Sequence, residues 1–97
     1  METLIHRRDD LTVQDLGAEM ILFDERSGTF HVLNDAARKI WHLLDGTRGS
    51  VSLSEQYANL YPQEDKHRLE SDLQRALEEF GRRGLLASSV ESRIMEG

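Results

Sequence analysis

The chain has 97 residues, of which 38% are hydrophobic and 31% charged, so it can build one thin core but not two independent domains. Its 12 Lys and Arg against 18 Asp and Glu give a net charge of -6, and this acidic balance disfavours a nucleic-acid binder, which must neutralise phosphates. Cysteine is absent, which excludes disulfides and thiolate chemistry and makes the cytoplasm the expected compartment.

No internal repeat, proline-rich stretch or glycine-serine linker divides the chain. We therefore expect one domain over residues 11–87, preceded by an N-terminal arm at residues 1–10 and followed by a flexible tail at residues 88–97. No apolar run approaches the roughly 18 residues needed to cross a bilayer, so no membrane partner is expected. The charged start of the chain is unlike a signal peptide.

Three short strands are predicted in the first third of the chain. Leu11, Val13 and Leu16 precede Gly17 in a strand-like pattern, and a compact apolar run follows at residues 20–23. Residues 24–28 are typical of a turn, and residues 29–33 are rich in β-branched and aromatic side chains. We expect the second and third strands to form a hairpin.

A first amphipathic helix is predicted directly after the third strand. Asn34 is a good N-cap, and Ile40, Trp41 and Leu44 recur at helical spacing behind it. Trp41 is expected in the core because apolar residues surround it on this face. Gly46 is predicted to end the helix.

Two further helices are predicted before the end of the domain. Ser52 and Glu55 have the spacing of a capping box, which predicts a helix start at Ser52, and Pro62 ends that helix. The third helix has apolar residues at 69, 73, 76, 77 and 80, and Gly84 closes it so that Leu85 folds back on the last turn. The predicted fold is therefore α+β and winged helix-turn-helix-like, with an N-terminal three-stranded antiparallel sheet followed by a three-helix bundle.

The residue types of common catalytic sites do not occur at useful spacings. His6, His31, His42 and His67 include no pair at the spacing of a helical metal site, and no phosphate-binding loop is present. No carboxylate lies in an apolar context that would raise its pKa for acid-base work. We expect no enzyme activity, no metal and no cofactor.

The stretch LNDAARKIWHLLDG, which begins at Leu33, resembles the PqqD family. The matching positions are Leu33, Asn34, Ala37, Ile40, Trp41, Leu44, Asp45 and Gly46. Leu16, Gly17 and Glu19 ahead of the apolar strand, the gap from Gly46 to Pro62, and the run at residues 84–86 agree with the same family.

This resemblance implies a stand-alone precursor-peptide recognition element of the kind used in quinone-cofactor (PQQ) and lasso-peptide biosynthesis. Such domains bind the leader region of a ribosomally synthesised peptide as an added β-strand, in a groove between the third strand and the third helix. They deliver it to a modifying enzyme, such as a radical-SAM protein or a leader peptidase. The peptide-binding residues implied here are Thr29, Phe30, His31, Val32, Leu33, Arg68, Leu69, Asp72, Leu73, Arg75, Ala76 and Glu79.

Alternatives remain open from the residues themselves. The third strand could be an ordinary hairpin strand, and the alternating charges along the third helix could be intrahelical ion pairs on a solvated face. The fold alone would also permit a DNA-binding winged-helix regulator or a protein-protein adaptor subunit. We expect a monomer or weak homodimer that binds no nucleic acid.

Overall fold

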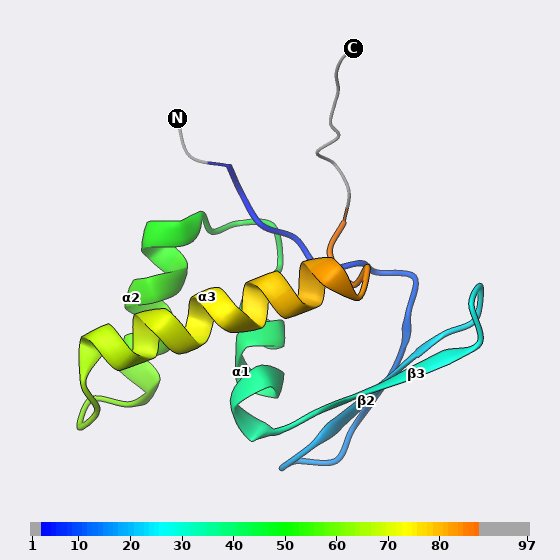
Figure 1. Cartoon of the computed structure of the whole chain (residues 1–97), viewed down its shortest axis with the longest axis horizontal. Helices are drawn as coiled ribbons and strands as arrows, with labels where there is room; N and C mark the ends of the chain where they lie inside the picture. The colour runs from blue at the N-terminus through cyan, green and yellow to red at the C-terminus, as the bar shows by residue number, and fades with distance from the viewer. Residues whose placement is uncertain (1–2, 88–97) are drawn as a thin grey trace.

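The computed structural model describes residues 3–87, which form a three-stranded sheet followed by three helices, as the sequence predicts (Figure 1). The predicted tail at residues 88–97 lies outside the described residues. The elements are β1 (Thr12–Asp15), β2 (Met20–Asp24), β3 (Thr29–Leu33), α1 (Asp35–Leu43), α2 (Ser50–Leu60) and α3 (Lys66–Arg82). Within the described part of the chain, no helix has both the length and the apolar character required to span a membrane.

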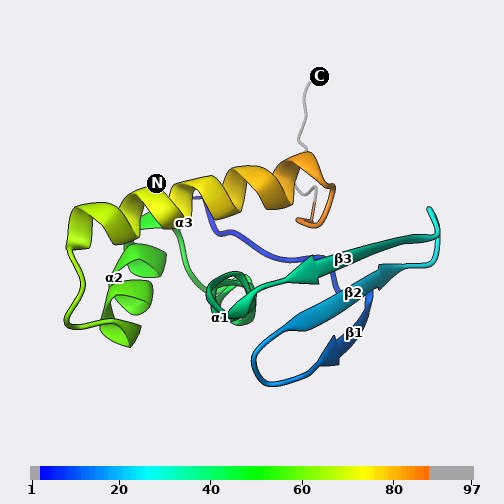
Figure 2. The same cartoon turned by 60° about the horizontal axis from the view of Figure 1, so that its bottom comes forward.

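The sheet is antiparallel with the strand order β1-β2-β3, so β2 is central and the other two strands are edges. Met20 and Leu22 of β2 are buried, whereas every residue of β1 is exposed. The apolar residues predicted for the first strand therefore contribute little to the core, and only Leu11 of that run is buried. Figure 2 shows β3 on the side of the sheet nearer α3, with β1 on the far side.

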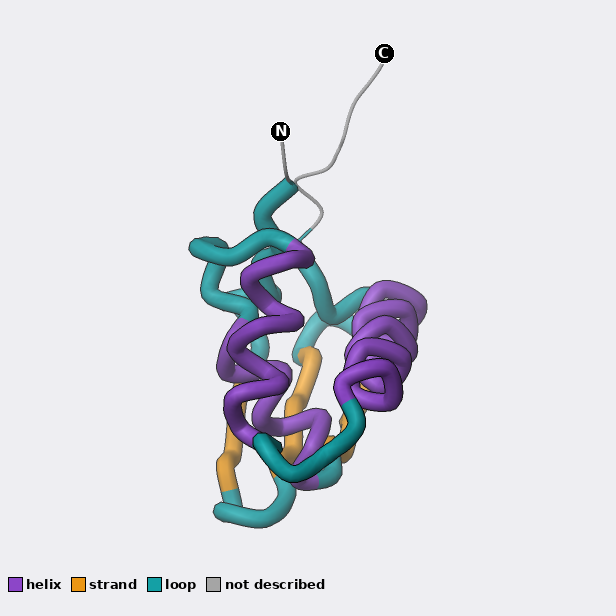
Figure 3. Tube along the Cα trace, turned by 90° about the vertical axis from the view of Figure 1, so that its left-hand side faces the viewer, coloured by secondary structure: helices purple, strands orange, loops and turns teal. Residues whose placement is uncertain are grey.

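Helices α1 and α2 lie towards one end of the molecule and the strands towards the other, and α3 runs from beside α2 towards the sheet (Figure 1). Figure 3, seen from the α2 side, shows the strands behind the helices. Their shared core contains Trp41, which is 2% exposed and packs edge-on against Phe80, with ring centroids 5.6 Å apart. The prediction that Trp41 is a core residue is confirmed. A buried indole removes more apolar surface from water than most other side chains do.

Helix α1 begins as predicted but ends early. The Asn34 side chain accepts a hydrogen bond from the Ala37 N–H at 2.9 Å, which confirms it as the N-cap. The helix stops at Leu43, three residues before Gly46, so the prediction that Gly46 ends it is wrong. The Leu44 N–H turns back to the Trp41 carbonyl, and the Leu44 carbonyl accepts from Arg7 instead of continuing the helix.

Gly46 has a different role, in the loop that receives the N-terminal arm. Its φ is 87°, a conformation that favours glycine, and an added Cβ would lie 3.2 Å from the His6 ring.

We expect Gly46→Ala to cost about 1–3 kcal/mol in the free energy of unfolding. Gly17→Ala is the matched control, because Gly17 has φ 91° but open space around it. Urea denaturation should show the larger loss for Gly46→Ala; equal losses would mean that the His6 contact is unimportant.

Helix α2 starts two residues before the capping-box signal. Its N-cap is Gly49 and its first residue is Ser50, so the prediction of a start at Ser52 is wrong. The Gly49 carbonyl already accepts the Leu53 N–H at 2.9 Å. Leu53 and Tyr57 are the buried residues of this helix.

Helix α3 ends as predicted, at a Schellman motif. The Leu85 N–H bonds the Phe80 carbonyl at 2.9 Å, and the Gly84 N–H bonds the Gly81 carbonyl at 3.1 Å. Gly84 has φ 71°, and Leu85 folds back into the core. The C-terminal end of α3 is thus fixed against the body of the domain.

The N-terminal arm is part of the packed structure. The Ile5 and Arg7 N–H groups bond the carbonyls of Arg48 and Leu44, and the Arg8 N–H bonds the carbonyl of Leu85. Residues 6 and 7 also form isolated bridges with residues 45 and 86. The arm therefore lies between the α1–α2 loop and the segment after α3.

Arg8 joins the β2–β3 hairpin to the end of α3. Its Nη1 donates to Asp24 Oδ2 at 2.9 Å and to the Gly84 carbonyl at 3.0 Å, and its Nε donates to Asp10 at 2.9 Å. The hydrogen bond from Arg8 holds the pKa of Asp24 below its usual range. These contacts link the end of the hairpin to the C-terminus of α3, and so limit how far the two can separate.

Candidate functional site

Strand β3 presents an open edge. It pairs with β2 on one side, and no strand among residues 3–87 pairs with its other side. Because N–H and C=O groups alternate in direction along an antiparallel strand, every second residue of β3 directs its backbone groups away from β2. Such an edge is a template for another extended chain.

The two faces of β3 differ in exposure. Phe30 and Val32 lie on the outer face and are 65% and 59% exposed, and the Phe30 ring lies 4.5 Å from that of Phe23 on β2. His31 is half-buried and Leu33 is buried on the face towards the core. The open edge is therefore flanked by an exposed apolar surface on the outer face of the sheet.

A cavity of about 460 Å³, which we call the α1–α3 groove, opens beyond the C-terminal end of β3. Asn34, the residue directly after β3, is at its margin. One wall comes from α1 and the other from α3, with Tyr57 of α2 between them. The lining residues are Asn34, Ala36, Ala37, Ile40, Tyr57, Asp72, Arg75, Ala76 and Glu79.

Four of the residues proposed for α3 from the sequence, Asp72, Arg75, Ala76 and Glu79, line this groove together. Arg75 Nη2 donates to Asp72 Oδ1 at 2.6 Å, yet its side chain is 73% exposed. Hydrogen bonds from Arg82, and then from Arg83, lower the pKa of Glu79, so it stays ionised at neutral pH. The α3 wall thus carries both signs of charge, and the predicted intrahelical ion pairs are present.

The remaining proposed residues lie elsewhere. Arg68 is exposed near Glu64 and Asp72, one turn before the groove, at distances of 3.7 and 3.9 Å. The side chains of Leu33, Leu69 and Leu73 are buried in the core. The physical reason is helical geometry: the apolar stripe of α3 faces α1 and α2, and the charged residues beside it form the wall.

Sequence reasoning missed the α1 and α2 side of the groove. Ala36, Ala37 and Tyr57 line it with Asn34, but they are far apart in the sequence from α3. Only Asn34 carried a usable signal, because a helix cap directly after an edge strand must lie at the end of that strand. In residues 3–87, no group of three His, Cys, Asp or Glu side chains is placed to hold a metal ion.

The family described as coenzyme PQQ synthesis protein D (PqqD) matches residues 19–86, which is more than half of the chain. The chain belongs to the PqqD family. The PqqD match contains β2, β3 and all three helices, and therefore the open edge and the whole α1–α3 groove. The arm and β1 precede it.

Two solved structures share the fold of this PqqD-family chain. One is TbiB1 in complex with the TbiA(beta) leader peptide, with 22% identity and a TM-score of 0.73, covering 86% of this chain and 95% of that one. The other is a lasso peptide synthetase B1 complexed with the leader peptide, with 21% identity and a TM-score of 0.71, covering 87% and 98%. No curated protein matches the chain.

Proposed function

We propose that this PqqD-family chain is a non-catalytic recognition domain that binds the leader region of a ribosomally synthesised precursor peptide as an added strand on β3. The observation that carries the proposal is the open edge of β3 leading into the α1–α3 groove. The two solved structures of the same fold, both complexes with leader peptides, support it. The leader then adds a fourth strand to the sheet.

Strand addition divides the leader into two sets of side chains. The backbone of the leader pairs with the N–H and C=O groups of β3 that face the edge, and its side chains alternate between the two faces of the sheet. One set lies beside Phe30 and Val32 on the outer face. The other set points towards the helices, where Arg75 and Glu79 offer charges of both signs. Affinity comes from the backbone pairing, and selectivity from these side-chain positions.

In this proposal, the partner enzyme and not this domain carries out the reaction on the precursor. The domain holds the leader extended and delivers the attached precursor to a modifying enzyme, either a radical-SAM protein or a leader peptidase. Because the precursor is a ribosomal product, we place this step in the cytoplasm. The charges on α3 favour a peptide over DNA, since Arg75 and Arg82 are already paired with carboxylates of the same helix.

Reversing the charge of Arg75 tests the groove. We expect Arg75→Glu to weaken leader binding about tenfold, or about 1.4 kcal/mol, because a charge at a partly desolvated groove interacts more strongly than one on an open surface. The melting temperature should hardly change, and the loss should shrink at high salt. Arg68→Glu should act in the same direction but more weakly, because Arg68 lies outside the cavity.

The measurement is calorimetric titration with the leader segment of the precursor encoded beside this chain, at two salt concentrations. Lys66→Glu is the matched control, since it makes the same charge change on α3 away from the α1–α3 groove. Wild-type protein that binds no leader peptide would disprove the proposed function. A salt-dependent gel shift with duplex DNA would favour the regulator instead.

A further inference from the structure

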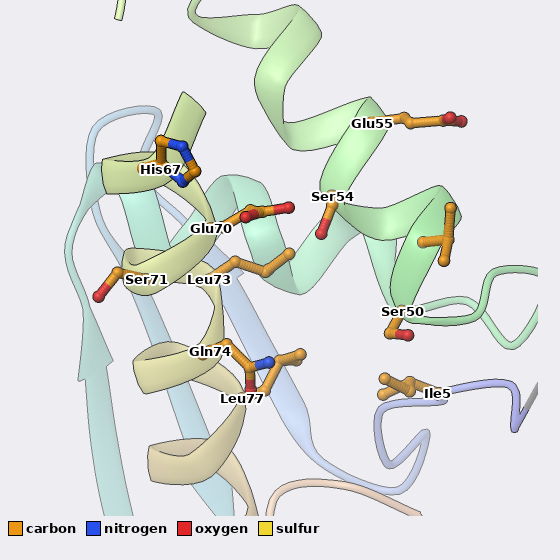
Figure 4. A pocket seen from close by; sticks show the side chains of 11 residues that line it. Ile5, Ser50, Ser54, Glu55, His67, Glu70, Ser71, Leu73, Gln74 and Leu77 are labelled. Carbon is orange, nitrogen blue, oxygen red and sulfur yellow. The ribbon is translucent and has the colours of Figure 1, made fainter. Parts of the chain in front are cut away.

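A second and larger cavity, of about 730 Å³, lies between α2 and α3, and we call it the α2–α3 groove (Figure 4). The α3 residues that line it include His67, Glu70 and Gln74, none of which lines the α1–α3 groove. At 100° per residue, Glu70 and Gln74 fall about 140–180° from Glu79, whereas His67 falls about 80° from Arg75. Helix α3 is thus a wall shared by two separate grooves.

Apolar and polar side chains both line the α2–α3 groove. Leu73 and Leu77 of α3 point towards α2, and Ile5 of the N-terminal arm closes one end (Figure 4). Val51, at the start of α2, lines it and is 64% exposed. Exposed apolar side chains around a concave surface are typical of a protein-protein contact.

The charges at this groove are of one sign. Glu55 and Glu70 line it, and no Lys or Arg does. Neither carboxylate forms an ion pair with any of residues 3–87, whereas Asp72 and Glu79 in the α1–α3 groove are both paired with arginines. A partner that places Lys or Arg beside apolar side chains would complement both features of the α2–α3 groove.

We propose that the α2–α3 groove is the docking surface for the modifying enzyme, which presents a segment with apolar side chains flanked by Lys or Arg. This inference rests on the proposed function, because a domain that delivers a peptide must hold the peptide and the enzyme at the same time. Helix α3 lies between the two grooves, so the leader and the enzyme are held on different sides of one rigid element.

Two variants test this surface without touching the α1–α3 groove. Glu70→Arg reverses an exposed charge, and Val51→Asp places a charge in the apolar part. Asp in the first turn of α2 favours the helix, so the fold should be kept. Titration with the enzyme encoded beside the precursor should show an affinity loss of about tenfold or more for each variant, with leader affinity unchanged.

Glu78→Arg is the matched control, because Glu78 is exposed on the same helix and lines neither groove. This variant should bind both the leader and the enzyme with wild-type affinity. Arg75→Glu should weaken the leader and spare the enzyme, so failure of leader binding is seen separately from failure of docking. If leader binding is normal but the enzyme does not bind wild-type protein, or binds Glu70→Arg and Val51→Asp equally well, the inference is overturned. A dimer in light scattering that Val51→Asp dissociates would assign the groove to a second copy, and would also overturn it.

Discussion

Trp41→Ala is expected to remove a large part of the stability of the protein and to unfold at a much lower urea concentration than wild type. The indole is almost completely buried and packs edge-on against Phe80, so truncation removes its transfer free energy and opens a cavity between α1 and α3. Replacing a buried aromatic by alanine costs about 3–5 kcal/mol. A domain of this size has only about 5–10 kcal/mol of stability to lose.

Circular dichroism during urea denaturation measures this loss without relying on the deleted fluorophore. Phe30→Ala is the matched control: it also removes an aromatic ring, but one that is 65% exposed on the outer face of β3. Its effect on stability should be small. If Trp41→Ala unfolds at the same urea concentration as wild type, Trp41 does not belong to the core and the packing described above is wrong.

Proline substitutions along β3 are expected to fall into two classes that alternate from residue to residue. Proline lacks the N–H donor, so it breaks the pairing with β2 at one set of positions and removes an edge donor at the other. Phe30 and His31 are neighbours and therefore belong to different classes, and Val32 shares the class of Phe30. One class should destabilise the fold. The other should stay folded and lose leader affinity by about tenfold or more.

Thermal denaturation assigns each variant to its class, and titration with the leader peptide measures the affinity of those that fold. The control is a proline at Val13 or Gln14 of β1, whichever leaves the fold intact, because β1 is the opposite edge of the sheet. That variant should bind the leader normally. Folded β3 variants that all bind like wild type would contradict strand addition.

Helix-end signals made of only a few residues predicted the structure well where the burial of neighbouring residues favoured the same helix end. Asn34 caps α1 because the strand before it and the helix after it are both fixed by buried residues. Gly84 ends α3 because Leu85 must return to the core. At Ser52 the capping signal was misleading, because α2 already begins at Ser50 and the Gly49 carbonyl accepts its first hydrogen bond.

The parts that could not be predicted depend on contacts between distant segments. The N-terminal arm has no periodicity, and it is held mainly by backbone hydrogen bonds, which any residue except proline can donate. The α1–α3 groove combines side chains from three helices. The spacing of the residues distinguished the apolar face of α3 from its charged face. It could not show which other elements cover each of these two faces. The placement of Leu69 and Leu73 in the core follows from those elements.

The arm also constrains the order in which the protein can fold during synthesis. Residues 6–8 pair with residues 85–87, so these contacts cannot form until the segment after α3 has been synthesised. The β2–β3 hairpin and the helices are local and can form early, while contacts between distant segments form slowly. Arg8 reaches the Gly84 carbonyl only after Gly84 has been synthesised. A nascent chain that has not yet reached Gly84 can therefore display the edge of β3 without the fixed position of α3 beside it.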